Sequence, residues 1–162
     1  MTLVDENDRL VGQAERKICH QFPGKLHRAI LVVVFDQRGQ ILLAKRVKGK
    51  LWQGIWDGTV ATHIFPKESP QQAAKRALSS ELGINHLTLK PHHFFVYQAK
   101  WKDKGVENEV CHLFTVKVNQ PIQANKKEVT TLKWTHPKDL RKEIKKNPAD
   151  FSPWFLEALK RL

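Results

Sequence analysis

Two carboxylates in the run Val106-Glu107-Asn108-Glu109-Val110-Cys111 carry the clearest chemical signal in the sequence. The run favours a β-strand, and residues two apart on a strand point to the same face. Like charges on one face repel unless solvent, a cation or a shared proton relieves them. Three upstream histidines, His20, His27 and His63, lie in segments that could fold back onto this strand. Three imidazoles and two carboxylates suit a divalent transition metal. The alternative is an exposed strand face with scattered histidines, because no ligand pair has a compact spacing such as HExxH.

The composition indicates a globular protein with a single core. The 162 residues are 41% hydrophobic and 27% charged, so we expect one domain over residues 1–162. The longest apolar run, Ala29 to Phe35, is too short to span a membrane, and the N-terminus has no signal-peptide pattern. Two cysteines, Cys19 and Cys111, do not indicate a disulfide framework. These features predict a cytoplasmic monomer with reduced thiols.

The formal net charge of +12 is compatible with several anionic partners. Nucleic acid, an anionic membrane surface and a small phosphorylated substrate would all be attracted by it. No zinc-finger or RNP-type motif accompanies the charge, so nucleic acid is the least favoured of these. The densest basic stretch, Lys138 to Lys146, alternates with Leu140 and Ile144 as a solvated amphipathic helix would.

The remaining pattern predicts a mixed α/β arrangement with a helix between two groups of strands. Strands are expected at 29–35, 40–45, 93–101 and 106–118, with a further one near 132–134 and hairpin turns at 36–39 and 102–105. A helix should begin after Ser69, which can form a capping box with Gln72, and should end at Gly83. Two short helices should close the chain, the last opening with Ser152-Pro153.

The capped helix resembles the signature helix of the Nudix superfamily, G-x5-E-x7-R-E-U-x-E-E-x-G-U, where U is aliphatic. The positions that match are Glu68, Arg76, Leu78, Glu81, Gly83 and Ile84, and those that depart are Thr62, Ala77 and Ser80. A diphosphate hydrolase needs clustered carboxylates to hold Mg²⁺. The lost carboxylates at 77 and 80 therefore argue against ordinary Nudix hydrolysis.

The wider pattern is similar to that of type I isopentenyl-diphosphate isomerases, a family with the Nudix fold. The similarity runs from Val4-Asp5-Glu6-Asn7 to Phe151-Ser152-Pro153-Trp154, with Leu26-His27-Arg28-Ala29, Trp56-Asp57-Gly58-Thr59, Glu68-Ser69-Pro70, Glu81-Leu82-Gly83-Ile84 and the ENEVC run between them. It implies an α/β (α+β) fold, a mixed β-sheet flanked by helices. It also implies the interconversion of isopentenyl and dimethylallyl diphosphate, in isoprenoid biosynthesis.

The resemblance implies two metal sites and a diphosphate site. The residues that match the family's ligands for Mn, Zn or Mg are His20, His27, His63, Glu107 and Glu109. Glu81 matches the helix glutamate that binds Mg²⁺ together with the substrate diphosphate. Basic residues that would hold the diphosphate are Arg16, Arg46 and Lys50, and Lys48 stays open as an alternative to Lys50.

The resemblance also implies the proton-transfer groups, one of which is absent. The family reaction adds a proton to one face of an alkene and removes one from the other through a tertiary carbocation. Trp154 matches the aromatic residue that stabilises the cation, and Tyr97 and Glu109 match the groups on one face. Ala61 stands where the family has a catalytic cysteine, and a methyl group cannot move a proton.

Three functions therefore stay open. The first is an isomerase with a substitute proton carrier, for which Thr62 and Thr59 are the first candidates. A displaced thiol or an ordered water could also act, but neither thiol is a ready replacement: Cys111 shares the strand face of Glu109, and Cys19 is a candidate only because it adjoins His20. The second is a protein that binds metal and diphosphate without turnover. The third is a Nudix-type hydrolase acting on another diphosphate.

Overall fold

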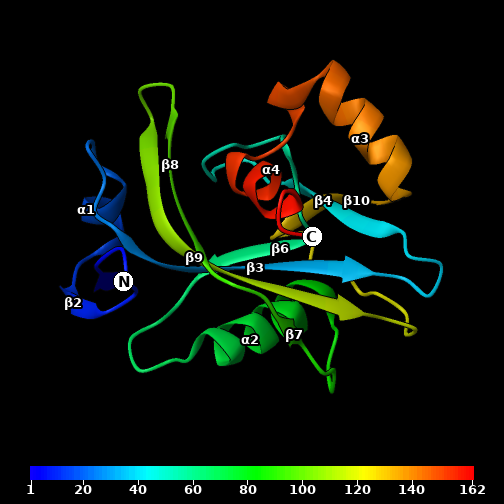
Figure 1. The fold of residues 1–162 in the computed structure, drawn as a ribbon, viewed down its shortest axis with the longest axis horizontal. Helices are drawn as coiled ribbons and strands as arrows, with labels where there is room; N and C mark the ends of the chain where they lie inside the picture. The colour runs from blue at the N-terminus through cyan, green and yellow to red at the C-terminus, as the bar shows by residue number, and fades with distance from the viewer.

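The computed structural model describes residues 1–162 and places a ten-stranded mixed sheet between helices on both faces (Figure 1). The strands are β1 (Thr2–Val4), β2 (Leu10–Gln13), β3 (His27–Phe35), β4 (Ile41–Arg46), β5 (Trp56–Asp57), β6 (Val60–His63), β7 (Lys90–Pro91), β8 (Phe95–Trp101), β9 (Gly105–Lys117) and β10 (Val129–Thr135). The helices are α1 (Arg16–His20), α2 (Pro70–Leu82), α3 (Pro137–Lys146) and α4 (Pro153–Leu159), with a short 3₁₀ turn at Pro148–Asp150.

β3 lies at the centre of the sheet because both of its faces are apolar. It pairs with β6 in antiparallel register and with β9 in parallel register, and Ala29 is opposite both His63 and Cys111. A strand covered on both faces has a continuous apolar sequence rather than an alternating one. This is the run predicted from the sequence, and the strand begins two residues earlier, at His27.

The two faces of β3 contribute to two separate hydrophobic clusters. Val32 and Val34 point to the cluster beneath α2, and Leu31 and Val33 point to the cluster beneath α3 and α4. In Figure 1, α2 lies on one side of the sheet and α3 and α4 on the other. Side chains alternate along a strand, so a single central strand anchors both layers.

The predicted central helix is confirmed in detail. Ser69 and Gln72 form the reciprocal capping box, and Pro70 occupies the first turn. Gly83 has φ 66°, the left-handed conformation that favours glycine, and its backbone N–H donates to Leu78 and Ser79. The capped end therefore fixes the last turn of the helix, which contains Glu81.

The predicted hairpin of β8 and β9 and both closing helices are confirmed, with shifts of one or two residues at their ends. Six strands and helices were not predicted: β1, β2, α1, β5, β6 and β7. All are five residues or shorter, so they carry too little periodicity to be recognised. None of the helices combines the length and apolar character needed to cross a bilayer.

Candidate metal centre and active-site cavity

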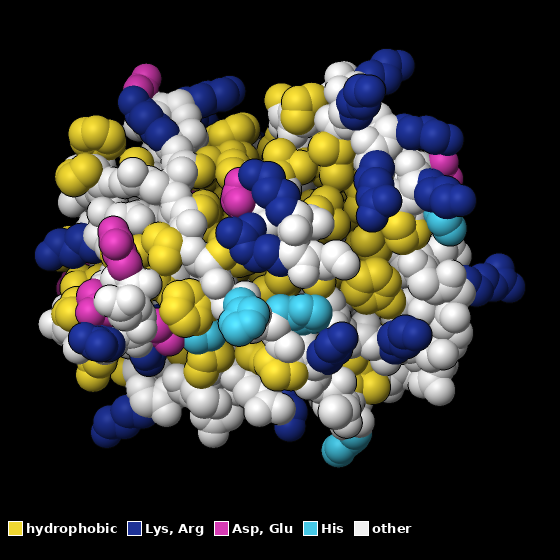
Figure 2. Space-filling view, in the orientation of Figure 1, with side chains coloured by type: hydrophobic (Ala, Val, Ile, Leu, Met, Phe, Trp, Pro, Cys, Tyr) yellow, Lys and Arg dark blue, Asp and Glu magenta, His cyan; other side chains and the backbone are white.

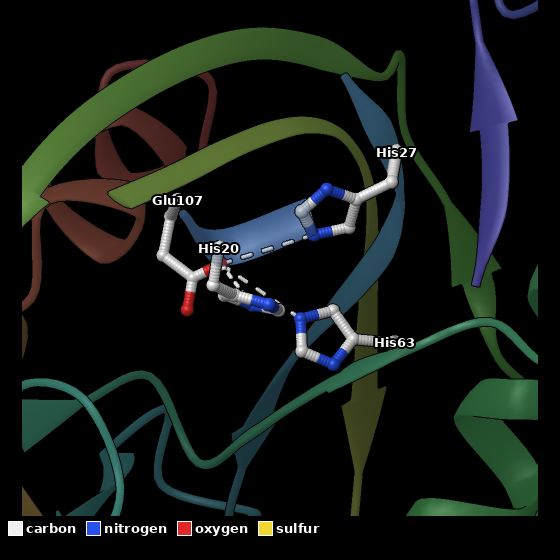
Figure 3. Close-up of side chains that lie close together, drawn as sticks. All are labelled: His20, His27, His63 and Glu107. Atoms are coloured by element: carbon white, nitrogen blue, oxygen red, sulfur yellow. Dashed lines mark ion pairs between the residues drawn. The ribbon is translucent and has the colours of Figure 1, made fainter. Parts of the chain in front are cut away.

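Three histidines and a glutamate converge from four different elements (Figure 3). His20 comes from α1, His27 from β3, His63 from β6 and Glu107 from β9. Their ligand atoms all lie within 4.8 Å of one another. The Oε2 of Glu107 is 3.0 Å from the Nε2 of His20, and 3.8 Å from the Nε2 of both His27 and His63. The structure therefore brings these four residues together, and that they bind a metal stays a prediction.

The inner atoms of this cluster are buried and lack hydrogen-bond partners. The Nδ1 atoms of His20 and His27 donate to the carbonyl oxygens of Arg16 and Lys25, each at 2.7 Å. A neutral imidazole that donates through Nδ1 presents a lone pair at Nε2, which is how metal-binding histidines are oriented. The Nε2 atoms of His20 and His27 and the Oε2 of Glu107 are unpartnered. Unpaired buried polar atoms are costly, so this donor set fits a divalent cation.

Glu109 lies beside the cluster as a fifth donor. Its Oε1 is 3.1 Å from the Nε2 of His63 and 3.5 Å from the Nε2 of His27. Its other oxygen accepts a hydrogen bond from the hydroxyl of Tyr97, which is the residue opposite Glu109 in the β8–β9 ladder. The carboxylate can therefore contact a metal with one oxygen and a protic group with the other.

The protonation states follow from burial and from the mutual contacts. Burial opposes the charged form of Glu109, but its contacts with His27 and His63 outweigh burial and hold the pKa of Glu109 below its usual range. Burial likewise opposes the charge on His63, but its contacts with Glu107 and Glu109 raise the pKa of His63 to about 9. Burial, with the nearby Glu109, raises the pKa of Tyr97 well above its ordinary value. Without a metal, His63 carries a proton at neutral pH.

A cavity of about 530 Å³ opens beside the cluster and contains the other predicted site residues. Its lining includes Arg16, Arg46, Lys50, Ala61, Thr62, His63, Glu81, Tyr97, Glu107, Glu109, Cys111, Glu128 and Trp154. Lys50 is part of this lining, whereas Lys48 is not. Arg16 reaches the cavity from α1, the short helix that was not predicted.

Two basic side chains that line the cavity are already paired with acids. The guanidinium of Arg46 donates from Nη1 to Asp57 at 2.8 Å, and the ammonium of Lys50 donates to Glu128 at 2.5 Å. Glu81 is nearby and only 8% exposed. Burial raises its pKa to about 7, partly offset by the charges of Lys50 and Arg46.

Two of these acids were missed as site residues. The sequence places Asp57 in a family landmark but gives it no predicted role, and it gives none to Glu128. The signal for Asp57 was the presence of two landmarks, WDGT and FSPW, which the fold brings into contact through Asp57, Ser152 and Trp154. Glu128 lies in a loop before β10 and had no sequence signal.

The structure narrows the groups that could replace the proton carrier at Ala61. The Thr59 hydroxyl donates to the Leu42 carbonyl at 2.5 Å and accepts from the Val34 N–H at 3.1 Å, so it is fully engaged. Cys19 is fully buried and does not line the cavity. Thr62 and Cys111 do line it. Burial, with the nearby Glu109, raises the pKa of Cys111 well above its ordinary value, so its thiol stays protonated.

Glu68 and Arg76, two matching positions of the Nudix-like motif, support the site without belonging to the metal cluster. Arg76 makes two hydrogen bonds to the carboxylate of Glu68, at 2.7 and 2.9 Å, and donates to the carbonyl of His63 at 3.1 Å. Ala77 is buried in the core beneath the helix. This arrangement holds His63 and leaves Glu81 as the carboxylate that α2 contributes to the cavity lining.

Known proteins resemble this chain in both sequence and fold. A family model described as the NUDIX domain matches residues 25–155. An isopentenyl-diphosphate Delta-isomerase of Streptomyces avermitilis is 37% identical over 161 residues, which cover 98% of this chain and 81% of the relative. One from Klebsiella pneumoniae is 35% identical, with 98% and 88% covered.

Solved structures agree on the fold. DR0079 from Deinococcus radiodurans superposes with a TM-score of 0.72 at 20% identity, covering 88% of this chain and 86% of that one. A MutT NUDIX hydrolase from Burkholderia pseudomallei has a TM-score of 0.64 at 16% identity, with 85% and 98% covered. The mixed sheet flanked by helices is thus a Nudix fold, as the sequence resemblance implied. Together with the sequence relatives, it places this chain in the isopentenyl-diphosphate Delta-isomerase family of the Nudix superfamily.

Proposed function

We propose that this protein interconverts isopentenyl and dimethylallyl diphosphate. The observation that carries the proposal is a single cavity beside a set of histidine and carboxylate donors, whose lining also includes basic side chains and an indole ring. A small diphosphate with a short apolar tail matches these groups. The proposal includes a monomer that acts in the cytoplasm through residues 1–162. Basic side chains are spread over the face in Figure 2 rather than gathered in one stripe, which favours a small anion over nucleic acid.

In this proposal, His20, His27, His63, Glu107 and Glu109 hold a divalent cation, Mn, Zn or Mg. A bound cation would supply the positive charge that keeps Glu107 and Glu109 together and orients Glu109. Glu81 would share a Mg²⁺ with the diphosphate and so neutralise part of its charge. Arg16, Arg46 and Lys50 would hold the diphosphate oxygens through charge-assisted hydrogen bonds.

The alkene end of the substrate would lie against Tyr97, Glu109 and Trp154. A proton adds to the terminal CH₂ carbon, and the double-bond electrons form the new C–H bond and leave a tertiary carbocation. The face of the Trp154 indole stabilises that cation. A proton then leaves the neighbouring CH₂ carbon, whose C–H electrons form the new double bond. Glu109, hydrogen-bonded to the Tyr97 hydroxyl, handles one of the two protons.

The second proton cannot pass through the methyl group of Ala61. Of the substitutes considered, Thr62 and Cys111 line the cavity. A second cavity of about 20 Å³ adjoins Ala61 and is lined by Asp57, Thr59 and Glu81, which is enough space for about one water molecule. We propose that one of these groups carries the proton, at a rate below that of a thiol at position 61.

Ala61 also favours a second candidate, a protein that binds metal and diphosphate without turnover. A Nudix-type hydrolase is less supported, because Ala77 is buried in the core and Ser80 is not a carboxylate. The helix thus lacks the clustered acids on which phosphoryl chemistry with Mg²⁺ depends.

The deciding experiment compares the unmodified protein with Ala61→Cys on isopentenyl diphosphate, with Mg²⁺ plus Mn²⁺ or Zn²⁺. Dimethylallyl diphosphate is followed by NMR, and Glu107→Gln controls for contaminating isomerase. We expect turnover by both proteins and a rate about 10²-fold higher for Ala61→Cys. Activity in Ala61→Cys alone would instead support the binding protein. Silence from both would overturn the proposed substrate.

A further inference from the structure

Asp57 is a buried carboxylate with every oxygen engaged. It ends β5 and is 3% exposed. Its Oδ1 accepts hydrogen bonds from the Gly58 N–H at 2.8 Å, the Ser152 hydroxyl at 2.8 Å and the Trp154 indole N–H at 2.7 Å. Its Oδ2 accepts from the Arg46 guanidinium at 2.8 Å. A buried carboxylate is costly unless its oxygens are satisfied, and here four donors satisfy them.

Apart from the neighbouring Gly58, these donors come from two other segments of the chain. Arg46 ends β4, whereas Ser152 and Trp154 open α4, about a hundred residues farther along the chain. Ser152 is in the N-cap position of α4, but its side chain makes no capping hydrogen bond. Its hydroxyl is directed to Asp57 instead. The start of the last helix is therefore attached to the cavity wall through Asp57.

The contacts define the positions of two side chains that the proposed reaction uses. The indole N–H of Trp154 has one acceptor, so the bond to Asp57 determines the direction of the ring. The guanidinium of Arg46 lies over that ring, 4.8 Å from its centroid, and its Nε donates to the Leu51 carbonyl at 2.9 Å. The Nε and Nη1 atoms of Arg46 each donate to a protein acceptor. The Nη2 atom has no protein acceptor.

We propose that Asp57 is a positioning residue that sets the distance between the diphosphate-binding side chain of Arg46 and the carbocation-stabilising ring of Trp154. One carboxylate orients Arg46 and Trp154 together, so the two ends of a bound substrate are held in a constant relation. The inference rests on the proposed function for its catalytic consequence. The coupling of Arg46 to Trp154 through Asp57 rests on the geometry alone.

The catalytic test is Asp57→Asn, which preserves size but removes the charge that pairs with Arg46. We expect kcat on isopentenyl diphosphate to fall about 10²-fold, because small misplacements of reacting groups cost that much. KM should change less than about threefold, because Arg46 keeps its own charge and Lys50 is untouched. Asp36→Asn is the matched control. Asp36 accepts from the N–H groups of Arg38 and Gln40 in the β3–β4 turn, outside the cavity, and should keep full activity.

The coupling test needs no turnover and uses inorganic diphosphate with Mg²⁺ as the probe. The chain has five tryptophans, so ¹⁵N-labelled protein gives five indole N–H signals, and Trp154→Phe identifies that of Trp154. We expect diphosphate to shift this signal in the unmodified protein and in Asp36→Asn, but not in Asp57→Asn.

Equal diphosphate-induced shifts in Asp57→Asn and the unmodified protein would overturn the inference, as would an equal kcat. The loss of activity in Asp57→Asn could also equal the loss of folded protein, while the folded fraction keeps the Trp154 response. That result would show a structural role only and would also overturn the inference. If the unmodified protein does not turn over isopentenyl diphosphate but the coupling test succeeds, the proposed function fails and the positioning role stands.

Discussion

Two groups of charged residues at the cavity, the histidine cluster and the basic pair Arg46 and Lys50, differ in how their charges are satisfied. In the histidine cluster, the Nε2 atoms of His20 and His27 and an oxygen of Glu107 face one another without hydrogen bonds. In the basic pair, Arg46 and Lys50 each already have an acidic partner. The histidine cluster therefore depends on an added cation, whereas the basic pair can form without a ligand and must exchange or share partners when an anion binds. The metal centre should be sensitive to every ligand, and the basic pair should be tolerant.

The largest effect should come from the metal centre. Glu107→Gln removes the charge that balances three imidazoles, so we expect metal occupancy to fall below about a tenth and turnover to fall by at least about 10³-fold. Metal analysis and the isomerase assay measure both. His92→Ala is the control, because His92 contacts Thr115 rather than the cluster. Normal metal content in Glu107→Gln would contradict the difference between the histidine cluster and the basic pair.

A smaller effect on turnover is expected when the Tyr97 hydroxyl, which donates to Glu109, is removed. Tyr97→Phe keeps the ring but removes the hydrogen bond to Glu109. We expect kcat to fall about 10²-fold, in the range for one acid–base group, with metal content unchanged. An unchanged kcat would show that Glu109 acts without Tyr97. Ring packing against Trp154, with centroids 5.8 Å apart, should persist.

In the basic pair, Lys50→Ala should weaken diphosphate binding moderately. The lost charge-assisted hydrogen bond should reduce affinity for Mg²⁺-diphosphate about tenfold, by calorimetry. Lys48→Ala is the matched control and should change affinity less than about twofold, because Lys48 does not line the cavity. The reverse ranking would assign the diphosphate to Lys48 and would place the loop differently.

The smallest expected effect is the number of protons released when the metal binds. Because the pKa of His63 is raised to about 9 in the metal-free protein, His63 is protonated near pH 7 and must lose that proton to bind a metal. Calorimetry in buffers of different ionisation enthalpy should find about one proton released near pH 7 and fewer as the pH approaches about 9. His63→Gln should release fewer protons at both pH values. A pH-independent count would contradict the cluster's protonation state.

The same raised pKa has a consequence for stability. Protonated His63 is stabilised by Glu107 and Glu109 in the folded state, so its contribution is present below its ordinary pKa of 6.5 and is lost as the pH rises through about 9. Metal-free protein should therefore lose part of its free energy of unfolding across that window.

The elements that the sequence predicted best are those with strong local signals. The apolar run of β3, the capping box of α2 and the β8–β9 hairpin each depend on neighbouring residues, and each is confirmed. α1 was missed because five residues carry no helical periodicity, although it brings both Arg16 and His20 to the site. Asp57 was missed because its role depends on Trp154, and no local pattern reports a contact between such distant positions.

By itself, the sequence determined which residue types are present and which lie on one strand face, so the pair Glu107 and Glu109 and the loss of a thiol at position 61 were readable directly. Whether His27 and His63 meet that pair was decided only by the parallel pairing of β3 with β9 and the antiparallel pairing of β3 with β6, and His20 reaches it from α1. Three further contacts were decided by the tertiary structure alone. They are the hydrogen bond from the Thr59 hydroxyl to the Leu42 carbonyl, the ion pair of Lys50 with Glu128, and the hydrogen bond from the Trp154 indole to Asp57. The physical reason is that alternation along a strand is a local property of the backbone, whereas strand order and buried hydrogen bonds depend on packing the whole chain.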